Sequence, residues 1–179
     1  MNKRLIIAFF VALSSVCGLY AQGYKEDFKA VQQAFQERLK TTPNALKNHL
    51  TTFPYTPYSD EIYLMEGVLY TEKGKYKQAT KVFNKITAKN LSRETQPMLY
   101  FYAGYALIQQ KQYEKALSLF LRLKNQKSTY APHARYYAGY CYYCMQDFPQ
   151  AMAEFLSVEH LGVYKKIAPY YIVQIYYAQ

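Results

Sequence analysis

The stretch GYCYYCMQDFPQAMAEF, residues 139–155, contains three marks whose spacing recurs twice upstream. A glycine is followed twelve positions later by an alanine and four positions after that by a phenylalanine (151−139 and 155−151). The three copies are Gly67, Ala79, Phe83, then Gly104, Ala116, Phe120, and then Gly139, Ala151, Phe155. All three marks shift together, by 37 residues and then by 35 (104−67 and 139−104). Because the spacing inside each copy is constant, the extra residues belong to loops between copies of one structural unit.

Each copy predicts a pair of helices that pack against each other. The first helices are expected at residues 58–72, 97–110 and 132–145, and the second at residues 76–89, 113–126 and 148–160. The glycine lets two backbones approach closely, the alanine keeps the second helix near, and the phenylalanine fills the space one turn further on. No alternating strand pattern of useful length is present, so the expected fold class is all-α.

A repeat of about 34–37 residues with this Gly, Ala and Phe pattern resembles the tetratricopeptide repeat. The chain departs from the family in having no tryptophan, and Tyr63, Tyr100 and Arg135 stand in the tryptophan column. The resemblance implies a superhelical solenoid of antiparallel helix pairs, right-handed, of an exported bacterial type. The expected order is a degenerate N-terminal helical pair at 22–56, repeats at 57–96, 97–131 and 132–168, and the first helix of a truncated fourth repeat at 169–179. In that register Tyr176 occupies the glycine column (139+37), and the chain is expected to be part of a longer protein.

The first 21 residues read as a secretory signal peptide. Lys3 and Arg4 precede an apolar run from residue 5 to 16, and Ala21 is a small residue at a suitable cleavage position. The alternative is a lipoprotein, in which Cys17 is acylated. Either processing route places the protein outside the cytoplasm, in the periplasm or at the outer membrane.

The segment after the leader has helical spacing of its apolar residues, namely Phe28, Val31, Ala34, Phe35 and Leu39. Pro43 is expected to begin a second short helix that continues through Leu50. The segment lacks the Gly, Ala and Phe marks. Terminal repeats are often atypical because they cap the stack, which favours a capping role here.

The formal net charge is +10, or +8 once Lys3 and Arg4 are removed (10−2). In an exported protein this balance favours anionic envelope surfaces or acidic partners over nucleic acid. Lysines recur every fourth residue in one segment, at Lys73, Lys77, Lys81, Lys85 and Lys89. On one helix they form a stripe, which reads as a solvated outer face or, alternatively, as a docking stripe for anionic lipid or glycan. The protein could then associate with a membrane by binding such lipids or by binding partners.

The sequence offers little for catalysis. Cys141 and Cys144 form a C-x-x-C that is explained by small buried residues, by a disulfide or redox role, or by a metal site. Zinc wants four ligands, and His49, His133 and His160 lie in different elements, so no metal and no cofactor are predicted. Acidic residues such as Glu154 are expected at helix surfaces. No nucleophile motif or phosphate-binding loop is found, and an enzyme is not predicted.

Aromatic residues mark one face of the predicted first helices at spacings of three and four. The face reads Glu61, Leu64, Val68, Thr71 in the first repeat, Met98, Phe101, Tyr105, Ile108 in the second, His133, Tyr136, Tyr140, Tyr143 in the third, and Tyr170, Val173, Tyr177 in the partial fourth. In proteins of this type that face lines a concave groove. The predicted partner-binding residues are Phe101, Tyr105, His133, Tyr136, Tyr140, Tyr143, Tyr170 and Tyr177. Tyr105, Tyr136 and Tyr140 are expected to be partly exposed; the alternative is that neighbouring helices cover these rings.

The predicted function is a non-enzymatic periplasmic or secreted scaffold that binds a protein or peptide in this aromatic groove, in envelope or outer-membrane assembly. The alternative is a glycan- or peptidoglycan-binding module that uses some of the 22 tyrosines. A final helix that is apolar on both faces predicts self-association through the C-terminal helix, because a terminal repeat needs a polar outer side.

Overall fold

The computed structural model describes the backbone of residues 3–178 and the side chains of residues 20–178. Within this part of the chain every regular element is a helix and there is no strand, so the all-α class is confirmed. The α-helices are α1 (Lys3–Gln36), α2 (Thr42–Thr52), α3 (Ser59–Glu72), α4 (Tyr76–Phe83), α5 (Gln96–Ile108), α6 (Tyr113–Leu123), α7 (Ala131–Cys144), α8 (Phe148–Leu156) and α9 (Tyr164–Ala178), with a short 3-10 helix η1 (Ala88–Asn90). The chain forms two compact units that divide between Met65 and Glu66. Most of the predicted leader, including Cys17, lies outside the residues whose side chains are described.

The first unit is built on the C-terminal part of α1 and on α2. Phe28, Val31 and Phe35 of α1 are buried with Leu46 of α2, as their helical spacing predicts. Pro43 lies in the first turn of α2, where its missing N–H costs no hydrogen bond. Leu39 continues the apolar spacing in the sequence, but 46% of it is exposed. The helix ends at Gln36 and Arg38 takes a φ of 56°, so the chain turns away before Leu39 is reached.

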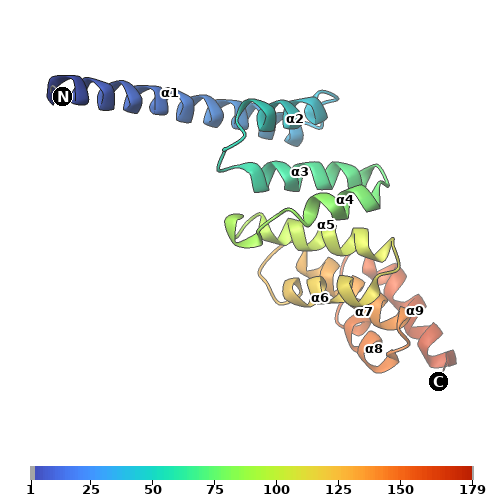
Figure 1. The fold of residues 1–179 in the computed structure, drawn as a ribbon. Coiled ribbons are helices and arrows are strands. Elements are labelled where there is room, and N and C mark those ends of the chain that lie inside the picture. The colour runs from blue at the N-terminus through green and yellow to red at the C-terminus, as the bar shows by residue number, and fades with distance from the viewer. Residues whose placement is uncertain (1–2, 179) are drawn as a thin grey trace. The chain divides into compact units, whose positions relative to one another are not determined.

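The second unit stacks helices in chain order (Figure 1). α5 packs on α6, α6 on α7, α7 on α8 and α8 on α9, and the first helices of successive pairs also touch, α5 with α7 and α7 with α9. Pairs that contact only their neighbours are the arrangement of an α-solenoid. The core therefore runs along the unit as a succession of similar layers.

The three marks of the repeat meet inside each helix pair. Ala79, Ala116 and Ala151 are completely buried. A Cβ built on Gly67 would lie 2.3 Å from the ring of Phe83, one on Gly104 2.7 Å from Phe120, and one on Gly139 3.1 Å from Phe155. The glycine thus makes room for the aromatic ring of its own repeat, which refines the expectation of a close approach between backbones.

The turn inside each pair uses the left-handed backbone conformation at one position. Gly74 has a φ of 70°, Lys111 of 58° and Gln146 of 63°. These residues are spaced as the repeat is, by 37 and 35 (111−74 and 146−111). The turn geometry is therefore part of the repeat, although only the first copy has the glycine that suits it.

The second helices are shorter than predicted. They end at Phe83, Leu123 and Leu156 instead of residues 89, 126 and 160. Asn84, Asn125 and Ser157 follow soon after, and such side chains compete for backbone hydrogen bonds; the Ser157 hydroxyl donates to the Glu154 carbonyl at 2.7 Å.

The early end of α4 also breaks up the lysine stripe. Lys77 and Lys81 lie on α4, whereas Lys85 follows it and Lys89 belongs to η1. All five lysines of the predicted stripe are exposed. They form a solvated set spread over four segments, namely the turn before α4, α4 itself, the turn after it and η1, so the single helical stripe was wrong.

The last helix begins one turn earlier than the repeat register predicts. α9 starts at Tyr164, and Pro169 lies inside it instead of at its first turn. Tyr164 is buried against the ring of Tyr136 on α7, and this burial stabilises the additional turn. Tyr176, expected in the buried glycine column, is exposed, because no described helix packs on that face of α9.

Glu154 was expected at a helix surface. This is wrong, since Glu154 is buried. Its carboxylate pairs with the ammonium group of Lys124, which follows α6. A buried carboxylate requires such a partner. This ion pair links α8 to the residue that follows α6, the second helix of the preceding repeat.

Candidate functional site

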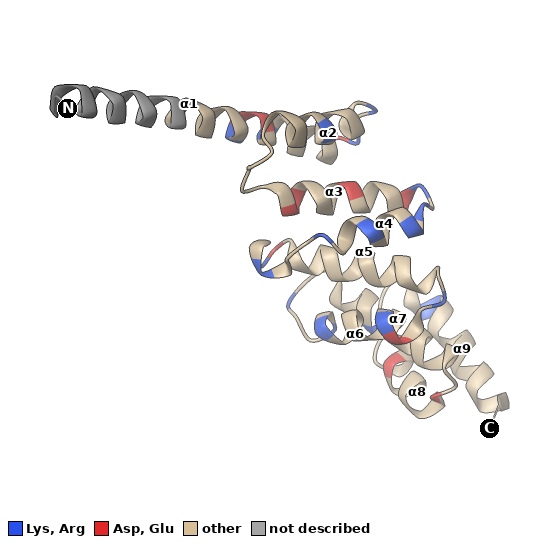
Figure 2. Ribbon diagram, in the orientation of Figure 1, with Lys and Arg blue, Asp and Glu red and all other residues tan. Residues whose placement is uncertain are grey.

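The first helices of the second unit present aromatic rings on helices with few charges. α5 contains no charged residue at all, and Figure 2 shows it uniformly uncharged along its length. Phe101 and Tyr105 of α5 and His133, Tyr140 and Tyr143 of α7 are each partly buried. Rings held at intermediate exposure keep surface available for a ligand while their neighbours fix their orientation.

The predicted site residues differ in exposure. Tyr136 was expected to be partly exposed, and this is wrong, since only 9% of it is accessible. Its ring stacks on Tyr164 at a centroid distance of 4.8 Å, because α9 begins early and covers it. Tyr170 and Tyr177 are exposed on α9. In the first repeat Leu64, Val68 and Thr71 are buried.

The structure gathers some of the predicted residues around a ring that the sequence analysis missed. Tyr171 of α9 lies 5.8 Å from Tyr140, 5.2 Å from Tyr143 and 5.4 Å from Tyr170 between ring centroids. It also stacks on Phe155 at 5.0 Å. Phe101, by contrast, meets His133 at 5.7 Å, further along the stack. The predicted set thus divides into two groups.

A cavity of about 320 Å³ opens beside the second of these groups, at Phe101. It is lined by the end of α3, the start of α4, and α5 and α7, all within the second unit: Thr71, Glu72, Tyr76, Phe101, Tyr102, Tyr105 and Tyr137. Phe101 and Tyr105 were predicted as site residues, whereas Tyr76, Tyr102 and Tyr137 were not. A signal was present, since Tyr102 and Tyr137 each stand two positions before the repeat glycine (104−102 and 139−137).

Burial raises the pKa values of the phenol groups of this region, which are protonated at neutral pH. Desolvation first, and then the neighbouring Tyr105 and Tyr171, raise the pKa of Tyr137 to about 12. Desolvation and a hydrogen bond with Tyr76 raise the pKa of Tyr105 as well. Neutral rings carry a negative face, which sets the electrostatics of the cavity. Desolvation also lowers the pKa of His133, which hydrogen-bonds to the Tyr164 hydroxyl.

A second cavity of about 360 Å³ lies between α4, α5 and α6. Its walls are mainly apolar, with Phe83, Leu99, Leu107 and Leu119 among the lining residues. The polar residues Thr80, Asn84, Gln112 and Lys115 and the ring of Tyr100 complete most of the lining.

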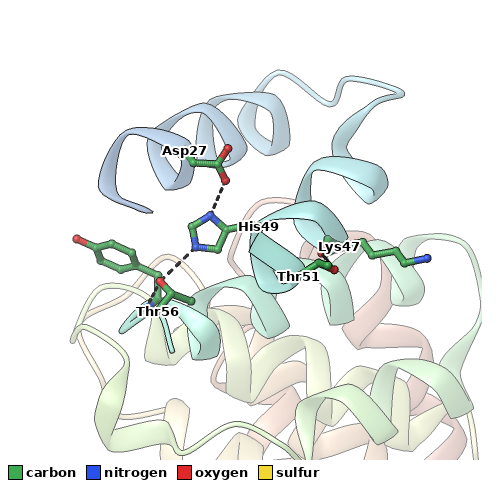
Figure 3. A network of polar contacts seen from close by, with 6 residues as sticks. Asp27, Lys47, His49, Thr51 and Thr56 are labelled. Atoms are coloured by element: carbon green, nitrogen blue, oxygen red, sulfur yellow. Dashed lines mark hydrogen bonds and ion pairs between the residues drawn. The ribbon is translucent and has the colours of Figure 1, made fainter. Parts of the chain in front are cut away.

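The first unit contains a polar constellation that superficially resembles a catalytic triad (Figure 3). His49 Nδ1 lies 2.6 Å from Asp27 Oδ2, and His49 Nε2 lies 3.2 Å from Thr56 Oγ1. The hydroxyl of Thr56 also accepts from the Tyr58 N–H at 3.2 Å. His49 has no exposed surface and Thr56 is buried, so a substrate cannot approach them. The contacts join α1, α2 and the loop that follows them.

The C-x-x-C pair lies on α7. Cys141 is buried, and desolvation and Cys144 raise the pKa of its thiol to about 12, so it is a poor nucleophile. This fits the reading of small buried residues. Within the described residues, both cysteines are unpaired thiols. No three His, Cys, Asp or Glu side chains gather there in a way that suits a metal ion.

The outer face of α9 exposes apolar surface at Tyr170, Val173, Tyr176 and Tyr177, the last of which is 86% exposed. Self-association through this helix stays a prediction. Among the described residues, no helix combines the length and the apolar character needed to cross a membrane.

Comparison with known proteins agrees with the helix-pair architecture. A family model described as Iml2/Tetratricopeptide repeat protein 39 matches residues 4–172. No curated protein and no solved structure gives a significant match. The matched residues comprise most of the chain and contain all three repeats. The chain therefore belongs to the Iml2/tetratricopeptide repeat protein 39 family.

Proposed function

We propose that the protein is an exported, non-enzymatic scaffold that binds a protein or peptide partner along the aromatic first helices of its second unit. Tetratricopeptide families generally serve as non-catalytic interaction scaffolds, which supports the class of function. The N-terminal sequence supports export, since its charged start, apolar run and small residue at Ala21 are those of a signal peptide.

The observation that carries the proposal is the set of partly exposed rings on α5 and α7, Phe101, Tyr105, Tyr140 and Tyr143. Large rigid aromatic side chains supply much of the binding energy at protein interfaces. Here they are held by contacts with neighbouring helices, so a partner would meet a preorganised surface.

A crosslinking capture from envelope extract tests the proposal. The wild-type chain should retain one or more specific proteins, and Tyr140→Ala should weaken retention by roughly 2 kcal/mol, the scale of an interface hot spot. Because Tyr140 also contacts Tyr113 and Tyr171, the melting temperature is measured in parallel. A large fall in melting temperature with unchanged retention would show that the ring is structural. Retention on insoluble envelope glycan without captured protein would instead favour glycan binding by the exposed tyrosines of α9.

A further inference from the structure

We propose that the cavity lined by Glu72 and the rings of Tyr76, Phe101, Tyr102, Tyr105 and Tyr137 binds the guanidinium group of an arginine side chain from the protein partner. The inference rests on the proposed function and names the chemistry of one contact within it. The whole cavity belongs to the second unit.

The five rings form an unbroken succession around the cavity. Between ring centroids, Tyr76 lies 6.2 Å from Tyr105, Tyr105 lies 5.6 Å from Tyr137, Tyr137 lies 5.9 Å from Phe101, and Phe101 lies 5.3 Å from Tyr102. Most of these contacts are edge to face. Each ring is therefore fixed by the next, and the enclosure is built from three successive repeats.

The charge of the enclosure favours a cation. Aromatic faces attract positive charge through their quadrupole, and the phenols of Tyr105 and Tyr137 are neutral at physiological pH. Glu72 supplies a carboxylate at the exposed end of α3. The neighbouring Lys73 and Lys75 do not line the cavity, and α5 contributes no charge. A basic protein thus places a negative, aromatic enclosure on its binding face.

Size and hydrogen bonding favour arginine among cations. The cavity of about 320 Å³ is at the lower end of ligand pockets, which run from about 300 to 1,000 Å³, so it suits one side chain. A guanidinium stacks on an aromatic face and donates to a carboxylate through two N–H groups at once. A quaternary ammonium has no N–H and cannot donate to the Glu72 carboxylate. A lysine ammonium is a strongly hydrated point charge that cannot stack in this way.

Titration of the full-length, tyrosine-labelled chain with N-acetyl-arginine methylamide tests the assignment by NMR. The ring signals of Tyr105 and Tyr137 should shift, and the citrulline analogue, which has the same shape without the charge, should leave them unchanged. Glu72→Gln and Tyr105→Leu should each weaken binding of the arginine probe about tenfold. The matched controls are Glu114→Gln, at an exposed position of α6, and Tyr55→Leu, whose ring is 90% exposed in the first unit; both should bind like wild type.

Three results would overturn the assignment. The citrulline probe could bind as tightly as the arginine probe, tetramethylammonium could bind more tightly than the arginine probe, or Glu72→Gln could bind the arginine probe with wild-type affinity. Glu72 is exposed, so its variant keeps the test decisive even where Tyr105→Leu fails to fold. Envelope proteins that Glu72→Gln captures as well as wild type does would refute the arginine contact and leave the scaffold function standing. Binding of the arginine probe by a chain that captures no protein would support the enclosure and refute the scaffold function.

Discussion

At the residue scale, one missing methyl group decides how each helix pair closes. The gap between a Cβ built on the repeat glycine and the phenylalanine ring widens along the chain, from 2.3 Å at Gly67 to 2.7 Å at Gly104 and 3.1 Å at Gly139. Contacts under about 3 Å require the ring to move, and overpacking of a core costs about 1–3 kcal/mol. In a helix, alanine is also more favourable than glycine by about 1 kcal/mol. The two effects oppose each other, and the distance decides which is larger.

We therefore expect a graded series when these glycines are replaced by alanine. Gly67→Ala should lower the free energy of unfolding by about 2 kcal/mol, Gly104→Ala by less, and Gly139→Ala should lie within about 1 kcal/mol of wild type. Urea denaturation followed by circular dichroism measures the series. In the Gly104→Ala background, Phe120→Leu should cost less than it does alone, because the smaller side chain relieves the contact. Equal losses at all three glycines would contradict this account.

The residues in the turns inside the helix pairs allow a second test at the residue scale. It measures what the left-handed backbone conformation costs a residue that has a Cβ. Lys111 and Gln146 hold the left-handed backbone conformation that Gly74 adopts without strain. Lys111→Gly and Gln146→Gly should each raise the free energy of unfolding by up to about 1 kcal/mol, after the entropy gained by the unfolded chain is subtracted. Gly74→Ala should lower it, and a Cβ there meets no neighbour within 4 Å, so the loss reports backbone conformation alone. Destabilisation by both glycine substitutions would show that the side chains contribute more than the turn.

At the element scale, α1 and α2 depend on one buried histidine. His49 has no exposed surface and bonds to Asp27 on α1 and to Thr56 beyond α2. His49→Ala should destabilise the first unit by about 2–4 kcal/mol, because it removes two hydrogen bonds and leaves a cavity. Hydrogen exchange should show lost protection in α1 and α2. The control is Lys47→Ala, at an exposed position of the same helix (Figure 3), which should leave protection unchanged. Unchanged protection in His49→Ala would mean that apolar packing alone holds the pair.

Helix starts were more predictable than helix ends. Pro43, Pro97 and Pro132 lie in the first turns of α2, α5 and α7, because a proline there is a local steric signal. The ends of α4 and α8 depend on loop residues with weak local preferences. The start of α9 depends on the burial of Tyr164, a tertiary effect that no local pattern contains.

The candidate site shows the same difference between local signals, which could be predicted, and contacts between helices, which could not. Phe101 and Tyr105 follow from helical spacing on one helix face. Tyr76, Tyr102 and Tyr137 join them only because α4, α5 and α7 meet around one cavity. The expectation of exposure for Tyr136 was wrong because helical spacing gives the direction of a side chain and does not reveal which later helix covers it.

At the scale of the whole molecule, the buried phenols couple the fold to alkaline pH. Burial raises the pKa of Tyr137 and of Tyr164 to about 12, and it raises the pKa values of Tyr136 and Tyr140 strongly as well. In the unfolded chain a tyrosine side chain has a pKa of about 10. The unfolded state therefore loses protons first, and the stability that these groups contribute is fully present below about pH 10 and decreases as pH rises toward 12.

We accordingly expect the melting temperature to fall steeply above about pH 10, together with a cooperative rise in phenolate absorbance. Tyr137→Phe should make the fall less steep by removing one of these ionisations. Tyr55→Phe, at an exposed ring, is the matched control and should reproduce the wild-type slope. Phenolate formation by all tyrosines without unfolding would contradict the burial of these side chains.

The linked rings of the second unit have an optical consequence. The chain has no tryptophan, so its ultraviolet emission comes from tyrosine alone. Rings at 4.8 Å, as between Tyr136 and Tyr164, or at 5.6 Å, as between Tyr105 and Tyr137, exchange excitation energy far faster than they emit. Light absorbed by one ring thus leaves from another with a different orientation. Emission from the folded chain should therefore be strongly depolarised although the rings are held in place, so the protein reports the proximity of its own rings without any attached dye.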